Sequence, residues 1–252
     1  MALFLRPAIS PFAIFSSQSI KMANTVSVSS LSETRKLPIL LFDVMDTLVR
    51  DPFYQDVPAF FGMSMKELLE IKHPTAWIEF EEGLINEEEL EKKFFKDGRP
   101  FDLEGLKACI KKGYHYLDGI KSLLLRLKRN CYEIHAFTNY PFWYMMIEEK
   151  LKLSAYLSWT YCSCNSGKRK PAPEAYFAVL KHLGVEPSSC IFIDDRMVNV
   201  EAAISTGMVG IHFKNADSLE KNLSLLGVET SIRGEKEYED LNPILQAKKQ
   251  PL

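Results

Sequence analysis

The chain has 252 residues, of which 46% are hydrophobic and 25% charged, the composition of an ordinary globular protein with one sizeable core or a core carrying a smaller insert. The net charge is −2 and Lys and Arg are dispersed among Asp and Glu, which argues against nucleic acid or an anionic membrane surface as a partner. No segment approaches the roughly 18 consecutive apolar residues of a membrane span, and the five cysteines show neither disulfide-framework nor zinc-site spacing.

The first 36 residues differ in composition from the rest. They are rich in Ser, carry Arg6 and Lys21, and contain no acidic residue before Glu33. This composition is typical of an organellar transit peptide, and its Ser bias favours the chloroplast. A disordered N-terminus without a targeting role is the alternative. We therefore expect residues 1–36 to precede the folded part of a protein of the plastid stroma.

The first predicted strand, residues 38–42, ends at a carboxylate. Asp43 follows this buried apolar run directly, and the hydroxyl of Thr47 follows on the loop. An aspartate in this position suits a nucleophile beside a metal ion. An aspartate at a strand end is also common for structural reasons, so Asp43 alone does not identify a site.

The strand signal stops between residues 51 and 116. Within this segment Asn86 and Glu89 form a capping box, and Ile85 and Leu90 are placed to form a hydrophobic staple around it. We predict a small helical cap over 51–116, inserted after the first strand, where it would cover the strand ends as a lid does.

Strand and helix patterns then alternate along the chain. Further apolar runs predict parallel strands over residues 133–137, 156–162, 190–193 and 209–213. Helices are predicted over 120–129, from Pro141 to about residue 150, and over 173–183, the last closed by Gly184. This order predicts an α/β fold with a doubly wound, parallel, Rossmann-like sheet that gathers ligands at the carboxyl ends of its strands. We place the core domain at 37–50 and 117–228, and a polar C-terminal tail at 229–252.

Polar side chains follow three of the predicted strands or their connections. Thr138 and Asn139 end the 133–137 strand, Lys170 lies in a cationic loop before a helix, and Asp194 and Asp195 end the 190–193 strand. Two adjacent carboxylates repel each other unless a cation neutralises them. Hard oxygen ligands of this kind, together with phosphate oxygens, are what Mg²⁺ prefers.

These segments, in this order, resemble the four motifs of the haloacid dehalogenase (HAD) superfamily of phosphohydrolases. The resemblance covers about residues 37–215, and its most specific parts are the Lys-Pro-x-Pro run from Lys170 and the Asp-Asp-x-x-x-Asn run from Asp194 to Asn199. It implies a phosphatase that takes Mg²⁺ as cofactor and acts on a small phosphorylated metabolite. A true dehalogenase needs no metal, and the pair Asp194-Asp195 argues against that branch.

The resemblance also implies a role for each matching residue. Asp43 would be the nucleophile that becomes a phosphoaspartate, and Lys170 would neutralise the nucleophile and the phosphoryl oxygens. Thr138 and Asn139 would hold the phosphoryl group together with Lys170. The metal ligands would be Asp43, the backbone carbonyl of Met45, Asp194 and Asp195.

Met45 departs from the family pattern. Phosphatases of this family carry at that position an aspartate that protonates the leaving oxygen and later activates water, and a thioether does neither. Asp46 is the obvious substitute, although a shift of one residue on an extended segment turns a side chain to the other face. Asp46 as a turn residue that bonds its own backbone, another acid such as Asp51, and a much slower enzyme remain as alternatives.

The sequence alone does not identify the substrate. The transit-like start, the small cap and the Asp-Val-Met-Asp motif of residues 43–46 are similar to those of plant chloroplast members of the family that hydrolyse flavin mononucleotide (FMN) to riboflavin and phosphate. Two groups of aromatic residues could stack on a flat substrate ring or pack a core: Phe60, Phe61, Trp77 and Phe80, and Tyr140, Phe142, Trp143 and Tyr144. A catalytically impaired HAD-fold binding or assembly protein of the plastid is the second hypothesis, and the oligomeric state is not predicted.

Overall fold

The computed structural model describes residues 37–231, so the predicted transit peptide, residues 1–36, lies outside the described residues, as does the tail from residue 232. Five strands form one parallel sheet in the order β3-β2-β1-β4-β5. They are β1 (Ile39–Phe42), β2 (Ile134–Thr138), β3 (Ser158–Cys162), β4 (Cys190–Asp194) and β5 (Val209–His212). All five predicted strands are present, and the doubly wound α/β fold is confirmed.

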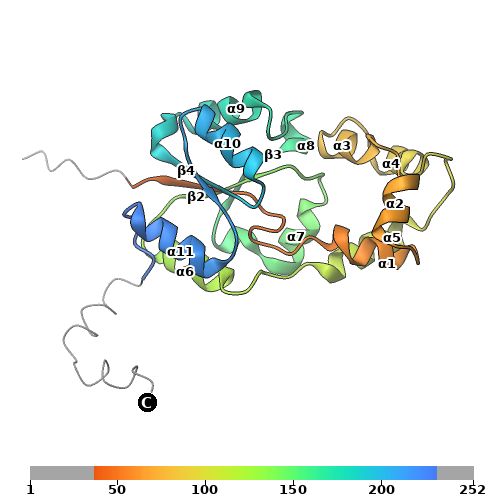
Figure 1. Cartoon of the computed structure of the whole chain (residues 1–252), viewed down its shortest axis with the longest axis horizontal. Coiled ribbons are helices and arrows are strands. Elements are labelled where there is room, and N and C mark those ends of the chain that lie inside the picture. Colours follow the sequence, from red (N-terminus) through yellow and green to blue (C-terminus); the bar gives the residue numbers. More distant parts are fainter. Residues whose placement is uncertain (1–36, 232–252) are drawn as a thin grey trace, which may run out of the picture. The chain divides into compact units, whose positions relative to one another are not determined.

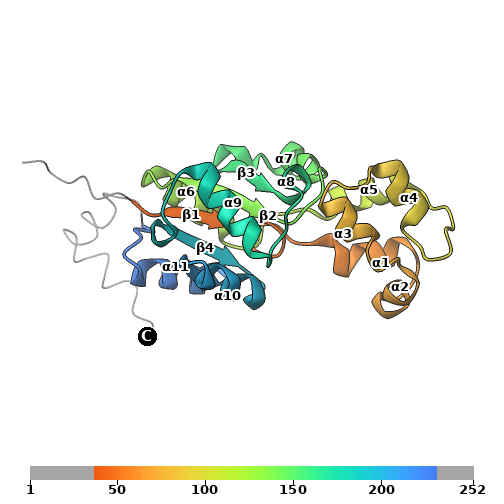
Figure 2. The same ribbon diagram turned by 90° about the horizontal axis from the view of Figure 1, so that it is seen from above.

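Helices cover both faces of the sheet (Figures 1 and 2). α6 (Ile120–Arg129), α7 (Tyr144–Leu151) and α11 (Ala216–Leu225) contribute to the core on one face, and α9 (Pro173–Leu183) and α10 (Met197–Ser205) to the core on the other. Along β1, Leu40 and Phe42 join the first core and Ile39 and Leu41 the second, because successive strand residues point to opposite faces. Burial on both faces explains why the strands read as continuous apolar runs. The short elements of this part are η2 (Leu153–Ala155), α8 (Ser163–Ser166) and η3 (Pro187–Ser189).

Two of the three predicted core helices match the structure. α6 and α9 have the predicted bounds, and Gly184 ends α9 with φ +65°, a left-handed conformation that glycine adopts without strain. The start predicted at Pro141 is wrong, because α7 begins at Tyr144. The N–H groups of Tyr144 and Met145 bond to the carbonyls three residues earlier, so a turn precedes the α-helix.

Between β1 and α6 the described chain is helical, as predicted for residues 51–116. The elements are η1 (Pro52–Tyr54), α1 (Asp56–Phe60), α2 (Met65–Ile71), α3 (Ala76–Glu81), α4 (Glu87–Lys93) and α5 (Leu103–Gly113). They lie together beyond the carboxyl ends of the strands (Figure 1). The capping box of α4 is confirmed: Asn86 N–H donates to Glu89 Oε2 at 2.8 Å, and Glu89 N–H donates to Asn86 Oδ1 at 2.9 Å. We call η1 to α5 the cap helices; the limits of the cap as a domain stay a prediction.

The start of the predicted tail is bonded to the end of α6. Asn130 Nδ2 donates to the carbonyls of Glu229 and Ser231 at 2.9 and 2.7 Å, and Arg126 Nε donates to the carbonyl of Thr230 at 2.6 Å. None of the helices within residues 37–231 combines the length and the apolar character needed to cross a membrane.

Candidate active site

Three carboxylates meet at the carboxyl ends of the two central strands. Asp43 directly follows β1, Asp194 ends β4 and Asp195 follows it. Because β1 and β4 pair with Phe42 opposite Ile193, the residues after these positions come together. One oxygen from each carboxylate lies within 4.8 Å of the other two. Such a set of hard oxygen donors fits a small divalent cation of the Mg²⁺ type.

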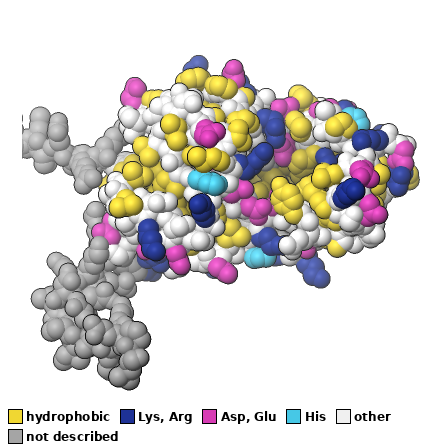
Figure 3. Space-filling model, viewed as in Figure 1, with side chains coloured by type: hydrophobic (Ala, Val, Ile, Leu, Met, Phe, Trp, Pro, Cys, Tyr) yellow, Lys and Arg dark blue, Asp and Glu magenta, His cyan; other side chains and the backbone are white. Residues whose placement is uncertain are grey.

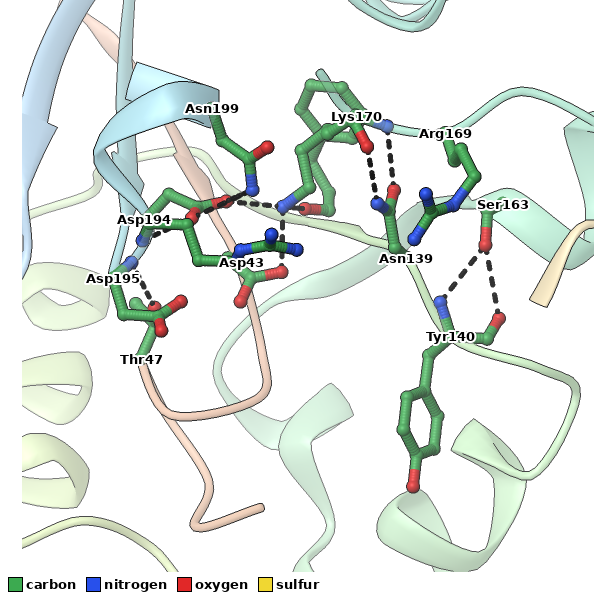
Figure 4. A network of polar contacts seen from close by, with 12 residues as sticks. Asp43, Thr47, Asn139, Tyr140, Ser163, Arg169, Lys170, Asp194, Asp195 and Asn199 are labelled. Atoms are coloured by element: carbon green, nitrogen blue, oxygen red, sulfur yellow. Dashed lines mark hydrogen bonds and ion pairs between the residues drawn. The ribbon is translucent and has the colours of Figure 1, made fainter. Parts of the chain in front are cut away.

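Lys170 lies between two of these carboxylates (Figure 4). Its Nζ donates to Asp43 Oδ1 at 2.7 Å, to Asp194 Oδ2 at 2.6 Å and to the Phe137 carbonyl at 2.8 Å, and 1% of the residue is exposed. Burial acts to lower the pKa of Lys170, but Asp194 and Asp43 outweigh it and raise the pKa above its ordinary value. Lys170 therefore stays charged and offsets part of the negative charge.

Two of the carboxyl groups, those of Asp43 and Asp195, have a pKa above that of a free aspartate. Burial raises the pKa of Asp43, with Asp194 and Asp195 adding to the rise and Lys170 opposing it. Burial, followed by the nearby Asp194 and Asp46, raises the pKa of Asp195 to about 6. The site therefore carries more negative charge than one lysine neutralises, and a divalent cation would relieve this excess.

Neighbouring polar groups fix the carboxylates in place. Asn199 Nδ2 donates to both oxygens of Asp194 at 3.0 Å, and Arg196 N–H donates to Asp194 Oδ1 at 2.8 Å. Asp195 N–H donates to Thr47 Oγ1 at 3.1 Å. Thr47, which the sequence placed on the loop after Asp43, thus ties that loop to the end of β4 (Figure 4).

The two residues predicted to hold a phosphoryl group differ in their surroundings. The hydroxyl of Thr138 is buried and finds no hydrogen-bond partner in the part of the chain that the structure describes, so it has a donor to offer. Asn139 lines the cavity described below, but its side-chain amide is engaged: Nδ2 donates to the Lys170 carbonyl and Oδ1 accepts from Lys170 N–H, both at 2.8 Å. Asn139 therefore positions Lys170, and its contact with a phosphoryl group stays a prediction.

Met45 and Asp46 both line the cavity, although adjacent residues of an extended strand would point apart. Asp46 adopts φ +53°, the left-handed conformation that aspartate tolerates better than most residues, and this bend removes the strand alternation. Asp46 Oδ1 accepts a hydrogen bond from Asp51 N–H at 2.8 Å. Asp46 is thus a turn residue that also faces the site.

A cavity of about 270 Å³ extends from these carboxylates to the cap helices. Figure 3 shows a hollow in this face of the molecule, with charged side chains towards the core and hydrophobic ones towards the cap helices. The aromatic side chains that line the cavity are Phe53, Tyr54, Trp77, Phe94 and Tyr140. Of the aromatic residues singled out in the sequence, Trp77 and Tyr140 reach the cavity, whereas Phe80 and Trp143 pack against each other with centroids 5.1 Å apart.

The cap helices contact the core through a partly buried ion pair that the sequence did not reveal. Arg169, the residue before Lys170, donates to Glu81 Oε2 at 2.8 Å, and Trp77 Nε1 donates to Glu81 Oε1 at 2.7 Å. Ser163 Oγ donates to the Glu81 carbonyl at 2.5 Å and accepts from Tyr140 N–H at 3.0 Å. Ser163 and Arg169 lie 82 and 88 residues from Glu81, so no local sequence pattern predicts their contact with it.

Lys72 is a further cation that lines the cavity, and no sequence motif pointed to it. It lies just after α2, lines the cavity, and burial lowers the pKa of its ammonium group. The only hydrogen bond of this ammonium group among the described residues is a long one, 3.4 Å, to the His73 carbonyl. Its charge is thus available to a ligand in the outer part of the cavity.

Comparison with known proteins agrees with this geometry. The chain is 68% identical over 206 residues to the chloroplastic flavin mononucleotide hydrolase 1 of Arabidopsis thaliana, covering 82% of this chain and 84% of that protein. It is 29% identical over 174 residues to a sesquiterpene phosphatase of Aspergillus oryzae, covering 65% of this chain and 84% of that protein.

The fold agrees with solved structures as well. A HAD family enzyme of Bacteroides thetaiotaomicron, in complex with magnesium and inorganic phosphate, superposes with a TM-score of 0.59 at 21% identity, over 71% of this chain and 95% of that one. The family model of haloacid dehalogenase-like hydrolases matches residues 38–207. The chain therefore belongs to the haloacid dehalogenase-like hydrolase family.

Proposed function

We propose that this protein is a Mg²⁺-dependent phosphatase that hydrolyses FMN to riboflavin and phosphate in the chloroplast. One observation carries the proposal: a single cavity is lined both by Asp43, Lys170 and Asp195 and by five aromatic side chains. The 68% identity to an enzyme named for FMN hydrolysis and for the chloroplast supports the substrate and the location. The Ser-rich, acid-poor composition of residues 1–36 agrees with that location.

In the proposed mechanism Asp43 is the nucleophile. An oxygen of its carboxylate attacks phosphorus, the bond from phosphorus to the ribityl oxygen breaks, and a phosphoaspartate forms. Lys170, bonded to Asp43 Oδ1, offsets the repulsion between the carboxylate and the phosphoryl oxygens. The Thr138 hydroxyl donates to a phosphoryl oxygen, and the Asn139 amide keeps the Lys170 segment in place beside the phosphoryl group.

The predicted metal ligands are Asp43, the Met45 carbonyl, Asp194 and Asp195. When bound, Mg²⁺ would supply positive charge to the phosphoryl oxygens. Asp194 already accepts from Lys170, Asn199 and the Arg196 N–H, so it also sets the position of the lysine. Replacing Met45 by another side chain would leave its carbonyl in place.

The outer part of the cavity suits a flat, partly polar ring. Trp77 and Tyr140 offer ring surface, with centroids 6.2 Å apart and planes at 71°, and Phe53 lies 6.4 Å from Trp77. Aromatic side chains of this kind supply large contact area to a planar ligand. Lys72 lines the same cavity and can donate to a carbonyl or ring nitrogen of a flavin.

The test is phosphate release by a protein that begins at residue 37, with Mg²⁺, from FMN and from a panel of other small phosphate monoesters. We expect riboflavin and phosphate in equal amounts from FMN, and none after Asp43→Asn. No phosphate from any monoester would overturn the proposal. The alternative of an impaired binding or assembly protein is not favoured, because the nucleophile, the lysine and the carboxylates are all present.

A further inference from the structure

Five carboxyl groups line the cavity, and most of them already have a partner or a role. They are Asp43, Asp46, Asp51, Glu81 and Asp195. Asp43 and Asp195 belong to the group of carboxylates that could hold a metal ion, and Glu81 is bonded to Arg169 and Trp77. Asp46 and Asp51 are left as groups that could move a proton in place of the aspartate missing at position 45.

Asp51 is held by its backbone, and its carboxylate is largely unengaged. It ends the loop from β1 and caps η1: its Oδ1 accepts from Phe53 N–H at 2.8 Å, and its own N–H donates to Asp46 Oδ1 at 2.8 Å. Within residues 37–231 no second hydrogen bond reaches the Asp51 carboxylate. The position of the residue is therefore fixed, while one carboxylate oxygen stays available to a ligand in the cavity.

The surroundings of Asp51 favour its protonated form. Burial raises the pKa of Asp51 to about 7, the hydrogen bond from Phe53 N–H opposes the rise, and the charges of Asp46, Glu81 and Asp195 add to it. A carboxyl group that gains and loses a proton near neutral pH can serve as both acid and base. Asp46 likewise has one engaged oxygen, Oδ1, and that oxygen holds the Asp51 backbone.

We infer that Asp51 is the general acid and base of the reaction, and that Asp46 is a positioning residue that holds it. This inference rests on the proposed phosphatase function. In the first step Asp43 attacks phosphorus, the bond from phosphorus to the ribityl oxygen breaks, and that oxygen takes the proton of Asp51, so riboflavin leaves as an alcohol. In the second step the Asp51 carboxylate takes a proton from a water molecule whose oxygen attacks the phosphoaspartate. The bond between phosphorus and the Asp43 oxygen breaks, and both aspartates return to their starting forms.

Asp51→Asn is a sharp test because asparagine keeps the oxygen that accepts from Phe53 N–H and the backbone N–H that donates to Asp46. The change removes only the transferable proton and the charge. Asp46→Asn likewise keeps its acceptor oxygen, so the two variants form an isosteric pair. Asp102→Asn is the matched control: Asp102 caps α5 through Gly105 N–H at 2.8 Å, in the same way, and does not line the cavity.

The substrates are FMN, whose leaving alkoxide needs a proton, and p-nitrophenyl phosphate, whose leaving phenolate does not. With Asp51→Asn we expect turnover of FMN to fall by about 10²–10⁴. Rapid mixing with p-nitrophenyl phosphate should still release one nitrophenolate per enzyme in a fast burst. Slow turnover should follow, because no general base activates water for hydrolysis of the phosphoaspartate. Asp46→Asn should change the rate of phosphoaspartate formation by the same factor for FMN and for p-nitrophenyl phosphate. Asp102→Asn should behave like wild type.

A double variant distinguishes loss of the general acid and base from structural damage to the loop. Adding Met45→Asp to Asp51→Asn puts a carboxylate where family phosphatases carry one, and it should recover at least about tenfold of the lost FMN turnover. Damage to the loop would not be repaired by this change. The inference would be overturned if Asp51→Asn kept wild-type rates, or if it lost activity equally on both substrates without a burst. It would also be overturned if the loss selective for FMN occurred in Asp46→Asn instead. Failure of the phosphatase proposal is distinguishable, since the wild-type enzyme would then release no phosphate from either compound.

Discussion

Lys170 Nζ lies 2.7 Å from Asp43 Oδ1, and this contact joins residues 127 positions apart in a place where the lysine is 1% exposed. A lysine is rarely buried so completely unless its charge is paired. Here it has two partners, because Asp194 Oδ2 lies 2.6 Å away on the other side. The proposed nucleophile is therefore paired with a cation before any ligand arrives.

Lys170→Met tests this pairing. Loss of the ammonium group leaves Asp43 and Asp194 buried beside each other without their cation, so we expect phosphatase activity to fall by about 10²–10³ and the free energy of unfolding to fall by about 3–5 kcal/mol. Phosphate release and urea unfolding measure the two effects. Lys168→Met, an exposed lysine two residues earlier, is the control and should leave both unchanged.

Asp195→Asn should stabilise the metal-free protein while weakening metal binding. Burial raises the pKa of Asp195 from 3.8 to about 6, so between these values the native state binds more protons than the unfolded chain. The free energy of unfolding contributed by this group therefore falls as pH rises through that window. Without metal, the variant should melt at a higher temperature than wild type at pH 8, and the difference should vanish near pH 4.

With Mg²⁺ at pH 8, wild type should melt at a higher temperature than Asp195→Asn, because a cation bound to the native state stabilises wild type more than the variant. Asp118→Asn removes an exposed carboxylate and serves as the control. If the variant melts below wild type in EDTA at pH 8, the charge excess inferred for the site is contradicted.

Lys72→Met tests the outer part of the cavity. A hydrogen bond from a charged donor contributes about 1.5–3 kcal/mol, so the KM for FMN should rise about tenfold or more. The KM for a small monoester such as glycerol phosphate, which does not reach the cap helices, should not change. Lys66→Met removes an exposed lysine of α2, the helix that ends just before Lys72, as a control. Equal rises for both substrates would contradict a role in recognising the ring.

Glu81→Gln tests the link between the cap helices and the core. The variant keeps an oxygen for Trp77 but loses the ion pair with Arg169, so the free energy of unfolding should fall by about 1–3 kcal/mol. The KM for FMN should rise as well, since Trp77 lines the cavity. Glu70→Gln, an exposed glutamate of α2, is the control in urea unfolding.

Much of the fold and of the group of three carboxylates was predictable, because both depend on repeated local patterns. Apolar runs that end in polar residues indicate buried parallel strands, and the ends of such strands meet at one edge of a sheet. That rule brought Asp43, Asp194 and Asp195 together from sequence positions about 150 residues apart. The resemblance to the HAD motifs then added Lys170, whose position no periodic pattern specifies.

The remaining features depend on contacts that the sequence does not encode locally. The Asn139 amide bonds to the backbone of Lys170, and Glu81 pairs with Arg169, across 31 and 88 residues respectively. The left-handed conformation of Asp46 placed it and Met45 in the same cavity, which strand alternation did not predict. Asp51 was one alternative among several until its burial and the single hydrogen bond to its carboxylate were known.

The most direct test of the account is to locate the phosphoryl group on the protein during turnover. Enzyme mixed with FMN and Mg²⁺ would be quenched in acid and treated with borohydride, which reduces an aspartyl phosphate to homoserine, and then digested for mass spectrometry. We predict homoserine at position 43, absent without substrate and absent in Asp43→Asn. Phosphate release from FMN with an unmodified Asp43, or with the modification at another aspartate, would contradict the account.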